Sequence, residues 1–368
     1  MMKTAVVILN WNTRDFLEKF LPGVLASAGC APDGTPAGDV EVIVADSAST
    51  DGSMELVAER FPAVRRIILE KNYGFTGGYN RALTHLGNED FRYFVLLNSD
   101  VEVPQGWLSP LVEWMDANPD CGACAPKLHA WQDRDSFEYA GAAGGLADPL
   151  GYTFCRGRVM KKVERDNGQY DGPADVFWAT GACLVVRAEA FRMVGGLDER
   201  FFAHMEEIDL CWRLQLHGWR ICVVSDSLVW HVGGGTLPAQ SPLKLFLNYR
   251  NNLLMLDNNL ARTYALDGLS PAKACRKAGM TIFLRMVLDG CSALVYLLTL
   301  KGRSFSAVVR AHREFRSLRS RPSPETVSAY AQSWRGKAEV HGRFPRWMVP
   351  RALFCSKEFF KQLHAFKG

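Results

Sequence analysis

The sequence predicts an α/β fold, in which a mostly parallel sheet forms the N-terminal part and a helical extension forms the C-terminal part. Two observations carry this prediction. Apolar, β-branched runs alternate with segments of helical periodicity over residues 1–100, and the chain beyond residue 262 is helical in pattern and strongly basic. Such alternation is typical of parallel βαβ units. We therefore expect two units, an α/β domain over 1–262 and a basic helical region over 263–368.

The N-terminal elements are expected in a regular order along the chain. Residues 4–9 form a continuous apolar run, which is typical of a strand buried on both faces. Pro22 lies within the first helical pattern and is expected to kink or shorten that helix. The further strands are expected over 40–45, 66–69 and 93–97, and the helices over 16–25, 53–61 and 78–86.

Composition and charge narrow the class of protein. With 368 residues, 48% hydrophobic and 22% charged, the chain is not extensively disordered. Residues 261–368 carry 20 Lys and Arg against 6 Asp and Glu, whereas the preceding residues carry 23 against 33. This asymmetry indicates two units with different partners, or simply a soluble, Arg-rich set of C-terminal helices. The ten Cys residues, without a secretion signal, favour reduced thiols in an intracellular protein.

The most apolar segment of the chain does not favour a membrane-spanning helix. Residues 280–300 are interrupted by Arg285 and Asp289, so they contain no run of about 18 apolar residues. A helix starting at Ser270-Pro271 is apolar enough to pack on the α/β domain or to lie in a membrane interface. The basic residues that follow it suit an anionic lipid surface, and no nucleic-acid-binding motif accompanies them.

Polar side chains follow three of the expected strands at the point where each ends. These segments are residues 10–12, 46–53 and 98–100. Ligands of open parallel sheets bind beyond the carboxyl ends of the strands. Asn, Asp, Ser and Gly are also ordinary turn residues, but three such ends together favour a site for a nucleotide and a metal ion. Neither a G-x-G-x-x-G fingerprint nor a G-x-x-x-x-G-K-[ST] loop is present, so the usual dinucleotide and P-loop sites are not supported.

These segments belong to an ordered series of motifs over residues 3–255. With it, the sequence resembles family 2 glycosyltransferases of the GT-A fold, a Rossmann-like, mostly parallel sheet, and in particular their bacterial rhamnosyltransferase-like branch. The motifs are Val7-Ile8-Leu9-Asn10-Trp11-Asn12, Asp46-Ser47-Ala48-Ser49-Thr50-Asp51-Gly52-Ser53, Asn72-Tyr73-Gly74-Phe75-Thr76-Gly77-Gly78-Tyr79-Asn80-Arg81, Asn98-Ser99-Asp100, Gly181-Ala182-Cys183, Gly195-Gly196-Leu197-Asp198-Glu199, residues 201–213, Trp230-His231 and Tyr249-Arg250-Asn251.

The resemblance implies a nucleotide pocket at the strand ends. It assigns Asp46 to the imide N–H of a uracil or thymine base, and an ionised carboxylate is indeed an acceptor for that donor. Arg250 is expected either to bring positive charge near the pyrophosphate or to form a salt bridge. The full nucleotide-binding set implied is Asn10, Asn12, Asp46, Asn72, Arg81, Asn98 and Arg250.

The resemblance also implies a divalent metal ion, Mg²⁺ or Mn²⁺. Asn98-Ser99-Asp100 stands where the family has its D-x-D motif, so Asp100 is the principal carboxylate ligand. His231 resembles the downstream histidine that completes the metal shell in some members. A packed histidine without a ligand role is the alternative for that residue.

An acidic cluster is the candidate source of the catalytic base. Matching by position makes Glu207 the base in a family that often has Asp there, and Glu206 remains the alternative. Asp209 belongs to the same candidate catalytic cluster, but it is spaced i, i+4 from Arg213 and could instead form a supporting ion pair. Acidic residues at a helix start also favour the helix dipole.

The resemblance implies an inverting, metal-dependent glycosyltransferase. The favoured donor is dTDP-rhamnose, and the expected acceptor is a saccharide or a polyprenyl-diphosphate-linked sugar of cell-surface polysaccharide synthesis. A UDP-hexose donor and a non-catalytic polysaccharide- or lipid-binding scaffold are the alternatives. A sugar-nucleotide nucleotidylyltransferase would carry a Gly-rich, basic loop near the N-terminus, which is absent. We expect a cytoplasmic protein and leave open its peripheral attachment to the inner face of the membrane.

Overall fold

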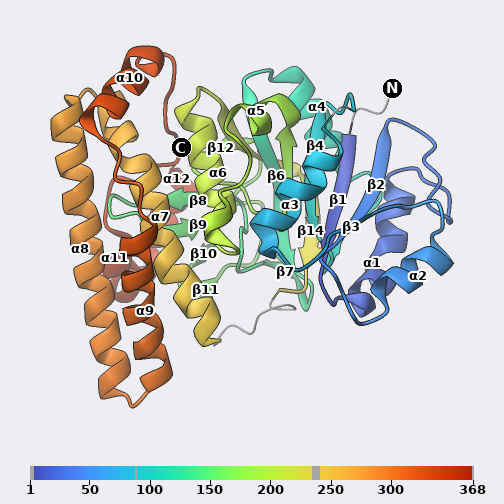
Figure 1. The fold of residues 1–368 in the computed structure, drawn as a ribbon, viewed down its shortest axis with the longest axis horizontal. Coiled ribbons are helices and arrows are strands. Elements are labelled where there is room, and N and C mark those ends of the chain that lie inside the picture. The colour runs from blue at the N-terminus through green and yellow to red at the C-terminus, as the bar shows by residue number, and fades with distance from the viewer. Residues whose placement is uncertain (1–3, 88, 234–240, 367–368) are drawn as a thin grey trace.

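The computed structural model describes residues 4–87, 89–233 and 241–366. A ten-stranded sheet occupies its centre (Figure 1). The strands of this sheet are β1 (Thr4–Asn10), β2 (Val40–Asp46), β3 (Arg65–Ile68), β4 (Tyr93–Asn98), β5 (Val101–Glu102), β6 (Cys121–Ala130), β7 (Asp133–Phe137), β12 (Ala174–Asp175), β13 (Cys183–Arg187) and β14 (Arg220–His231).

The strand order confirms the predicted α/β class with a mostly parallel sheet. The order is β12-β14-β6-β13-β4-β1-β2-β3, with β5 paired to β14 and β7 paired to β6. β1 is parallel to β2 and β4, β2 is parallel to β3, and β14 is parallel to β6. β13 runs antiparallel between β4 and β6. The carboxyl ends of β1, β2 and β4 therefore meet at one edge of the sheet.

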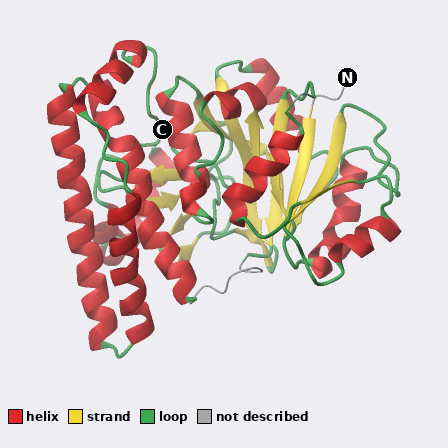
Figure 2. Ribbon diagram, viewed as in Figure 1, coloured by secondary structure: helices red, strands yellow, loops and turns green. Residues whose placement is uncertain are grey.

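Helices cover both faces of the sheet (Figure 2). The apolar side chains of β1 and β2 alternate between two cores: one contains α1 (Arg14–Ser27) and α2 (Ser53–Arg60), and the other contains α3 (Gly74–His85). Pro22 lies inside α1, which nevertheless extends over 14 residues. The expected shortening is wrong, because a proline removes only one helical hydrogen bond and the buried face holds the helix together.

The first helix after β3 begins four residues earlier than the glycine-rich sequence suggests. α3 starts at Gly74, whose φ is +72°, and the side-chain oxygen of Asn72 accepts a hydrogen bond from the Gly74 N–H at 2.8 Å. Because glycine is a poor helix former, Gly77 and Gly78 make the first turn of this helix hard to recognise from the sequence. A side chain at Gly78 would collide with Leu9 of β1, which explains why the helix needs glycine there.

The second half of the α/β unit adds further helices and a small sheet. The helices are α4 (Leu108–Ala117), α5 (Ala188–Met193), the 3₁₀ turn η1 (Glu199–Phe201) and α6 (Glu206–Leu216). The small sheet has the order β11-β10-β9-β8 and consists of β8 (Gly145–Ala147), β9 (Thr153–Cys155), β10 (Arg158–Val159) and β11 (Lys162–Val163). Its apolar side chains pack against the last two helices of the chain.

The C-terminal region is helical, as predicted. α8 and α9 form a long helical pair at one edge of the molecule, far from β3 at the other edge (Figure 1). The expected domain boundary at residue 262 lies inside α7, a helix in contact with α6, α8, α9 and α10. The helices are α7 (Pro242–Leu266), α8 (Pro271–Leu298), α9 (Gly302–Leu318), α10 (Pro324–Trp334), α11 (Met348–Phe354) and α12 (Ser356–Ala365).

Helix α8 buries the two charges that interrupt its apolar sequence. Arg285 Nε lies 3.2 Å from Asp289 Oδ1, and both side chains are buried. The remaining surface of α8 is largely exposed and apolar. By length and apolarity alone, α8 is the one helix in the described part of the chain that could cross a membrane.

Candidate functional site

The ends of β1 and β2 form a buried polar pair. Asn10 and Asp46 are opposite one another in the parallel register, and Asn10 Nδ2 donates to Asp46 Oδ1 at 2.7 Å. Asp46 also accepts from the N–H of Ser49 at 2.9 Å and from its hydroxyl at 2.6 Å. These bonds use three of the roughly four acceptor positions of a carboxylate. Asp46 can therefore accept one further hydrogen bond, for example from the imide N–H of a nucleotide base.

Short polar contacts connect this pair with the end of β4. Thr13 Oγ1 lies 2.5 Å from Asn10 Oδ1 and 2.9 Å from Ser99 Oγ, in the segment that precedes Asp100. Asn12, whose φ is +52°, fixes the loop after β2 by accepting from the Thr50 N–H at 2.8 Å. Thr13 was not among the sequence-predicted residues, and its only signal was its place directly after Asn12.

Three other predicted nucleotide-binding residues, Asn98, Asn72 and Arg81, make contacts outside this network. Asn98 ends β4, and its N–H donates to the carbonyl of Ala182 at 2.9 Å. Asn72 caps the start of α3. Arg81 lies further along α3, stacks on Tyr73 and pairs with Glu199 at 3.0 Å. The surface hollow around Arg81 contains no residue of the β1, β2 or β4 ends, so the structure does not bring Arg81 together with Asp46.

Asp100 and His231, the predicted metal ligands, face one another. β5 pairs with the end of β14, which places His231 Nε2 at 3.2 Å from Asp100 Oδ1. His231 Nδ1 lies 3.5 Å from an oxygen of Glu138, a buried carboxylate that sequence reasoning missed. Glu138 follows β7, and only the antiparallel pairing of β7 with β6 brings it to this place.

The charges of Asp100, His231 and Glu138 shift the pKa values of their neighbours. Burial lowers the pKa of His231, but the carboxylates of Asp100 and Glu138 outweigh burial and raise that pKa to about 10. Burial raises the pKa of Asp100, and the hydrogen bond and charge of His231 reverse this effect and leave it below its usual value. The two carboxylates thus favour a positive charge between them, either a proton on the His231 ring or a cation in its place.

This donor set suits a divalent cation bound in an open site. Carboxylate oxygen is the ligand that Mg²⁺ and Mn²⁺ prefer, and a neutral imidazole can add a nitrogen. Among the described residues no group of three or more His, Cys, Asp or Glu side chains could hold a metal ion by itself. Asp100 and His231 therefore fit a metal ion whose remaining ligands come from a bound diphosphate.

The acidic cluster at the start of α6 contains two carboxylates that are each only partly hydrogen-bonded. Glu206 and Glu207 each have one oxygen that is buried and accepts no hydrogen bond. Burial raises the pKa of Glu207 to about 7, and burial together with the charge of Glu207 raises the pKa of Glu206 well above its usual value. A Cβ on Gly181 would lie 3.3 Å from that of Glu207, so glycine leaves room for this side chain. Since Ala182 follows Gly181 and bonds Asn98, Glu207 lies beside the end of β4.

Asp209 has a different environment from Glu207, although both belong to the first turn of α6. Its side chain is fully buried and bonds Arg213 at 2.6 Å, Asn258 at 2.9 Å and Asn259 at 2.8 Å. These donors come from α6 itself and from α7. The structure therefore does not bring Asp209 to the strand ends with the other candidate catalytic residues, and the supporting ion pair is the role that it has.

The turn before α6 is held by α7. Phe202, His204 and Met205 all have φ between +63° and +71°, a conformation that side chains other than glycine rarely adopt. Asn251 Nδ2 donates to the carbonyls of Phe201, Ala203 and His204 at 2.7–2.9 Å. This amide therefore fixes the turn that aims the two glutamates, a role that the sequence did not reveal.

Arg250 has a position different from the one expected of a pyrophosphate ligand. It is buried, forms an ion pair with Glu314 of α9 and donates to the carbonyls of Arg200 and Phe201 at 3.0 and 2.9 Å. The salt bridge left open from the sequence is thus present, in a buried form. Through it, the C-terminal helices are connected to the turn before α6.

Comparison with known proteins is consistent with this arrangement. The family model for glycosyl transferase family 2 matches residues 5–192. N-acetylglucosaminyl-diphospho-decaprenol L-rhamnosyltransferase of Mycobacterium tuberculosis is 30% identical over 243 residues, which are 61% of this chain and 75% of that protein. The dTDP-rhamnosyl transferase RfbF of Shigella flexneri is 21% identical over 229 residues, which are 59% of this chain and 71% of that protein.

The fold is also similar to that of a solved structure. The S. aureus TarS fragment 1–349 in complex with UDP-GlcNAc superposes with a TM-score of 0.51 at 15% sequence identity. The match covers 94% of this chain and 93% of that chain. It confirms the GT-A fold with C-terminal helices that the sequence predicted.

Proposed function

We propose a specific activity for this chain, which belongs to glycosyl transferase family 2 and is a glycosyltransferase: inverting transfer of a sugar from a nucleoside diphosphate to a saccharide or lipid-linked acceptor. The observation that carries the proposal is the continuous network Asp46–Asn10–Thr13–Ser99. It joins an acceptor for the nucleotide base to the segment of Asp100, beside which Glu207 lies. A base site, a diphosphate site and a proton acceptor thus adjoin at one sheet edge.

Glu207 is the proposed general base. Its carboxylate takes the proton of an acceptor hydroxyl while that oxygen forms a bond to the anomeric carbon and the bond to the nucleoside diphosphate breaks. Attack from the face opposite the leaving group inverts the configuration. Because burial raises its pKa to about 7, Glu207 is a stronger base than an ordinary glutamate at neutral pH. Glu206 is the alternative base, but its greater burial makes ionisation harder.

Asp100 and His231 are the proposed ligands for Mg²⁺ or Mn²⁺. When bound, such a cation supplies positive charge that stabilises the departing diphosphate. Asp46 and Asn10 hold the base, and Asn12 orders the loop beside it. The residues of the chain thus orient the donor so that its anomeric carbon faces Glu207.

The favoured donor is dTDP-rhamnose, with a UDP-hexose as the alternative. The choice is supported by the similarity to two rhamnosyltransferases, one of which is named for a dTDP-linked donor. Uracil and thymine present the same imide N–H to Asp46, so the base pocket alone does not separate the two donors. The similarity to an enzyme of a diphospho-decaprenol acceptor supports a polyprenyl-diphosphate-linked acceptor in polysaccharide synthesis.

Calorimetric titration tests the nucleotide site. We expect dTDP or UDP to bind only with Mn²⁺ present, and GDP and NAD to bind weakly. Asp46→Asn should weaken binding by at least about tenfold, because a charge-assisted hydrogen bond is lost. Asp226→Asn, at an exposed position of β14, is the matched control and should bind like the wild type. A folded protein that binds none of these nucleotides would instead support the non-catalytic scaffold.

Transfer assays then separate the two donors. The protein is incubated with dTDP-rhamnose or UDP-GlcNAc and a polyprenyl-diphosphate-linked sugar, and the product is identified by mass spectrometry. Transfer from dTDP-rhamnose, with an inverted anomeric configuration by NMR, would establish the favoured reaction. Transfer from the UDP-sugar alone would replace it with the alternative donor.

The exposed face of α8 supports a peripheral location at the inner face of the cell membrane. Phe283 and Leu298 are 60% and 74% exposed, and the turn after α8 adds Leu300 at 94%. Exposed basic side chains of the adjacent turn and α9 flank this face, namely Lys301, Arg303, Arg310, Arg313 and Arg316. Apolar side chains bordered by cations favour an anionic bilayer over a neutral or protein surface.

Vesicle flotation tests this location. We expect the protein to float with phosphatidylcholine vesicles that contain phosphatidylglycerol, and less with phosphatidylcholine alone. Phe283→Ser should reduce flotation, while Ile68→Ser, an equally exposed position on β3, should not. A concentration-dependent dimer in sedimentation that Phe283→Ser abolishes, without any flotation, would assign the face to a second copy of the chain instead.

A further inference from the structure

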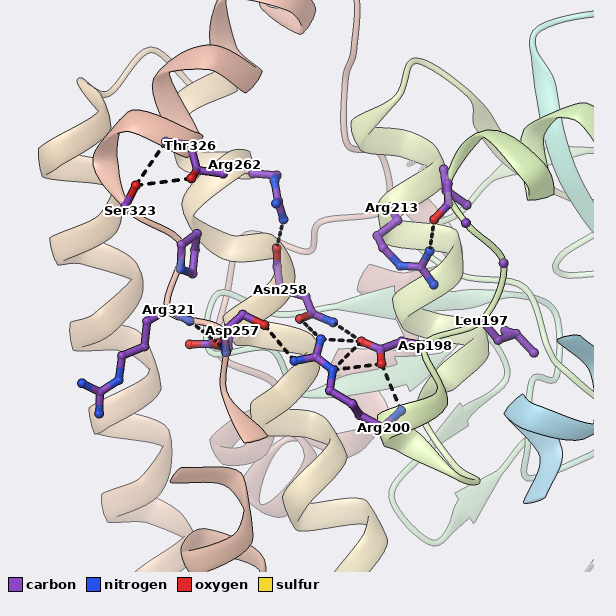
Figure 3. Close-up of a pocket in the computed structure, with 15 residues that line it drawn as sticks. Leu197, Asp198, Arg200, Arg213, Asp257, Asn258, Arg262, Arg321, Ser323 and Thr326 are labelled. Carbon is purple, nitrogen blue, oxygen red and sulfur yellow. Dashed lines mark hydrogen bonds and ion pairs between the residues drawn. The ribbon is translucent and has the colours of Figure 1, made fainter. Parts of the chain in front are cut away.

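A second cavity lies away from the strand ends, between α6, α7 and the segment that leads into α10 (Figure 3). Its volume is about 580 Å³. None of Asp46, Asp100 and Glu207 lines it, so it is separate from the proposed active site. Its charged lining consists of Asp198, Arg200, Arg213, Asp257, Arg262 and Arg321.

Both acidic residues of the lining are already neutralised by protein groups. The carboxylate of Asp198 pairs with the guanidinium of Arg200 and accepts from Asn258. Asp257 pairs with Arg319 at 3.1 Å and accepts two backbone N–H bonds at 2.8 and 3.0 Å. The negative charge in the cavity is therefore committed, and none of it compensates the remaining arginines.

Two arginines on opposite walls keep unused donors. Arg262 of α7 bonds only the carbonyl of Asn258 within its own helix. Arg213 of α6 bonds Asp209 and Val194, but its Nη2 is buried without a partner. Figure 3 shows the two side chains on the two helices that border the cavity, whereas Arg321 points away from it. Burial lowers the pKa of Arg262; Tyr330 and Asp209 oppose this effect, and the charge of Arg213 adds to it.

The neighbouring groups extend this set of donors. Ser323 and Thr326, at the first turn of α10, place hydroxyl groups at the rim of the cavity. Guanidinium groups match the oxygens of phosphate in geometry as well as charge. Hydroxyls beside a helix N-terminus are a further environment that favours phosphate oxygens.

From these contacts we propose that the cavity between α6 and α7 binds a phosphate or diphosphate group, held by Arg262 and the free Nη2 of Arg213. Two sources carry this chemistry: free pyrophosphate or phosphate in solution, and the diphosphate of a lipid headgroup. The site is independent of the proposed transfer reaction, because it uses neither the strand ends nor a metal ion.

The test is a calorimetric titration of the whole protein with sodium pyrophosphate at low salt and with EDTA. Removal of divalent cations keeps the proposed diphosphate site at Asp100 from contributing, so the result stands even if the glycosyltransferase proposal fails. Arg262→Gln should weaken pyrophosphate binding by at least about tenfold. Arg262→Lys should weaken it by less, because lysine keeps the charge but lacks the paired N–H donors of the guanidinium. Arg66→Gln, an exposed arginine of β3, is the control and should bind normally.

Vesicles distinguish the two sources. Retention on phosphatidylcholine vesicles that carry a polyprenyl diphosphate should fall in Arg262→Gln if the ligand is a lipid headgroup, and should be unchanged if the ligand is a free anion. Two results would overturn the proposal. One is a folded wild-type protein that takes up no pyrophosphate at millimolar concentration, and the other is Arg262→Gln or Arg262→Lys binding pyrophosphate as tightly as the wild type.

Discussion

The two sides of helix α6 use their carboxylates in opposite ways. On the side of the sheet, Glu207 keeps a buried oxygen without a hydrogen bond, as does its neighbour Glu206, and the pKa values of both are raised. On the side of α7, Asp209 is fully buried, and three donors surround it. A carboxylate with all its partners connects helices, whereas one without partners remains available to take a proton. The number of donors therefore separates the structural Asp209 from the candidate catalytic Glu207.

The largest expected effect comes from removing the charge on the sheet side. Glu207→Gln should lower kcat by about a thousandfold, the usual range for a general base, and should leave donor binding intact. Removing a buried, unpaired charge should not reduce the free energy of unfolding. Steady-state kinetics together with thermal unfolding measure both effects. If Glu207→Gln keeps full turnover and Glu206→Gln does not, Glu206 is the general base.

Removing the carboxylate of Asp209, on the side of α6 that faces α7, should instead affect stability. Asp209→Ala leaves Arg213, Asn258 and Asn259 without their shared acceptor, and should cost about 3 kcal/mol of unfolding free energy. The activity of the protein that remains folded should change little. Urea unfolding gives the first quantity, and kcat per folded molecule gives the second. A kcat loss equal to that of Glu207→Gln, without destabilisation, would return Asp209 to the catalytic cluster.

The pH dependence should sharpen the same contrast. Because the base must be ionised, kcat/KM should fall about tenfold per pH unit below the raised pKa of Glu207, near 7. The folded pKa lies above the unfolded value of 4.5, so folding favours the protonated form. Stability should therefore fall as pH rises from 4.5 through the folded pKa. Glu207→Gln should remove this part of the slope, and a slope unchanged in that variant would place the titration elsewhere.

The sequence was sufficient for the parts of the site that follow a strand in the chain. Asp46 and Asp100 could be located because buried strands are short apolar runs and their polar ends are adjacent in sequence. Glu138 and Asn251 could not, because each reaches its place through pairing with a distant element. Thr13 could not, because its contact with Ser99 depends on β1 and β4 being neighbours in the sheet. For Arg81 and Asp209, sequence position identified the elements, but not that the first pairs with Glu199 and the second with Arg213, Asn258 and Asn259.

The smallest expected effect comes from Asn251 of α7, which connects that helix to the turn before α6. Asn251 does not face the strand ends, but its amide holds the three carbonyls of the turn before Glu206 and Glu207. The Phe201 carbonyl keeps its bonds from Arg250 Nη2 and the Ala203 N–H, so Asn251→Ala chiefly affects the carbonyls of Ala203 and His204. We expect a cost of about 1–2 kcal/mol and a turn that relaxes from its left-handed conformation. We expect kcat to fall about tenfold while KM for the donor is unchanged, since Asp46 and Asn10 are untouched.

Asn252→Ala is the matched control for this prediction. Asn252 is the next residue of α7, is also buried, and donates to the carbonyl of Gly151 at 3.0 Å, away from the turn. Both variants should lose similar stability in urea unfolding, but only Asn251→Ala should lose kcat. Equal kcat losses in the two variants would mean that general loosening of α7, and not the aim of α6, limits turnover. A loss confined to Asn251→Ala would make it a positioning residue for the base.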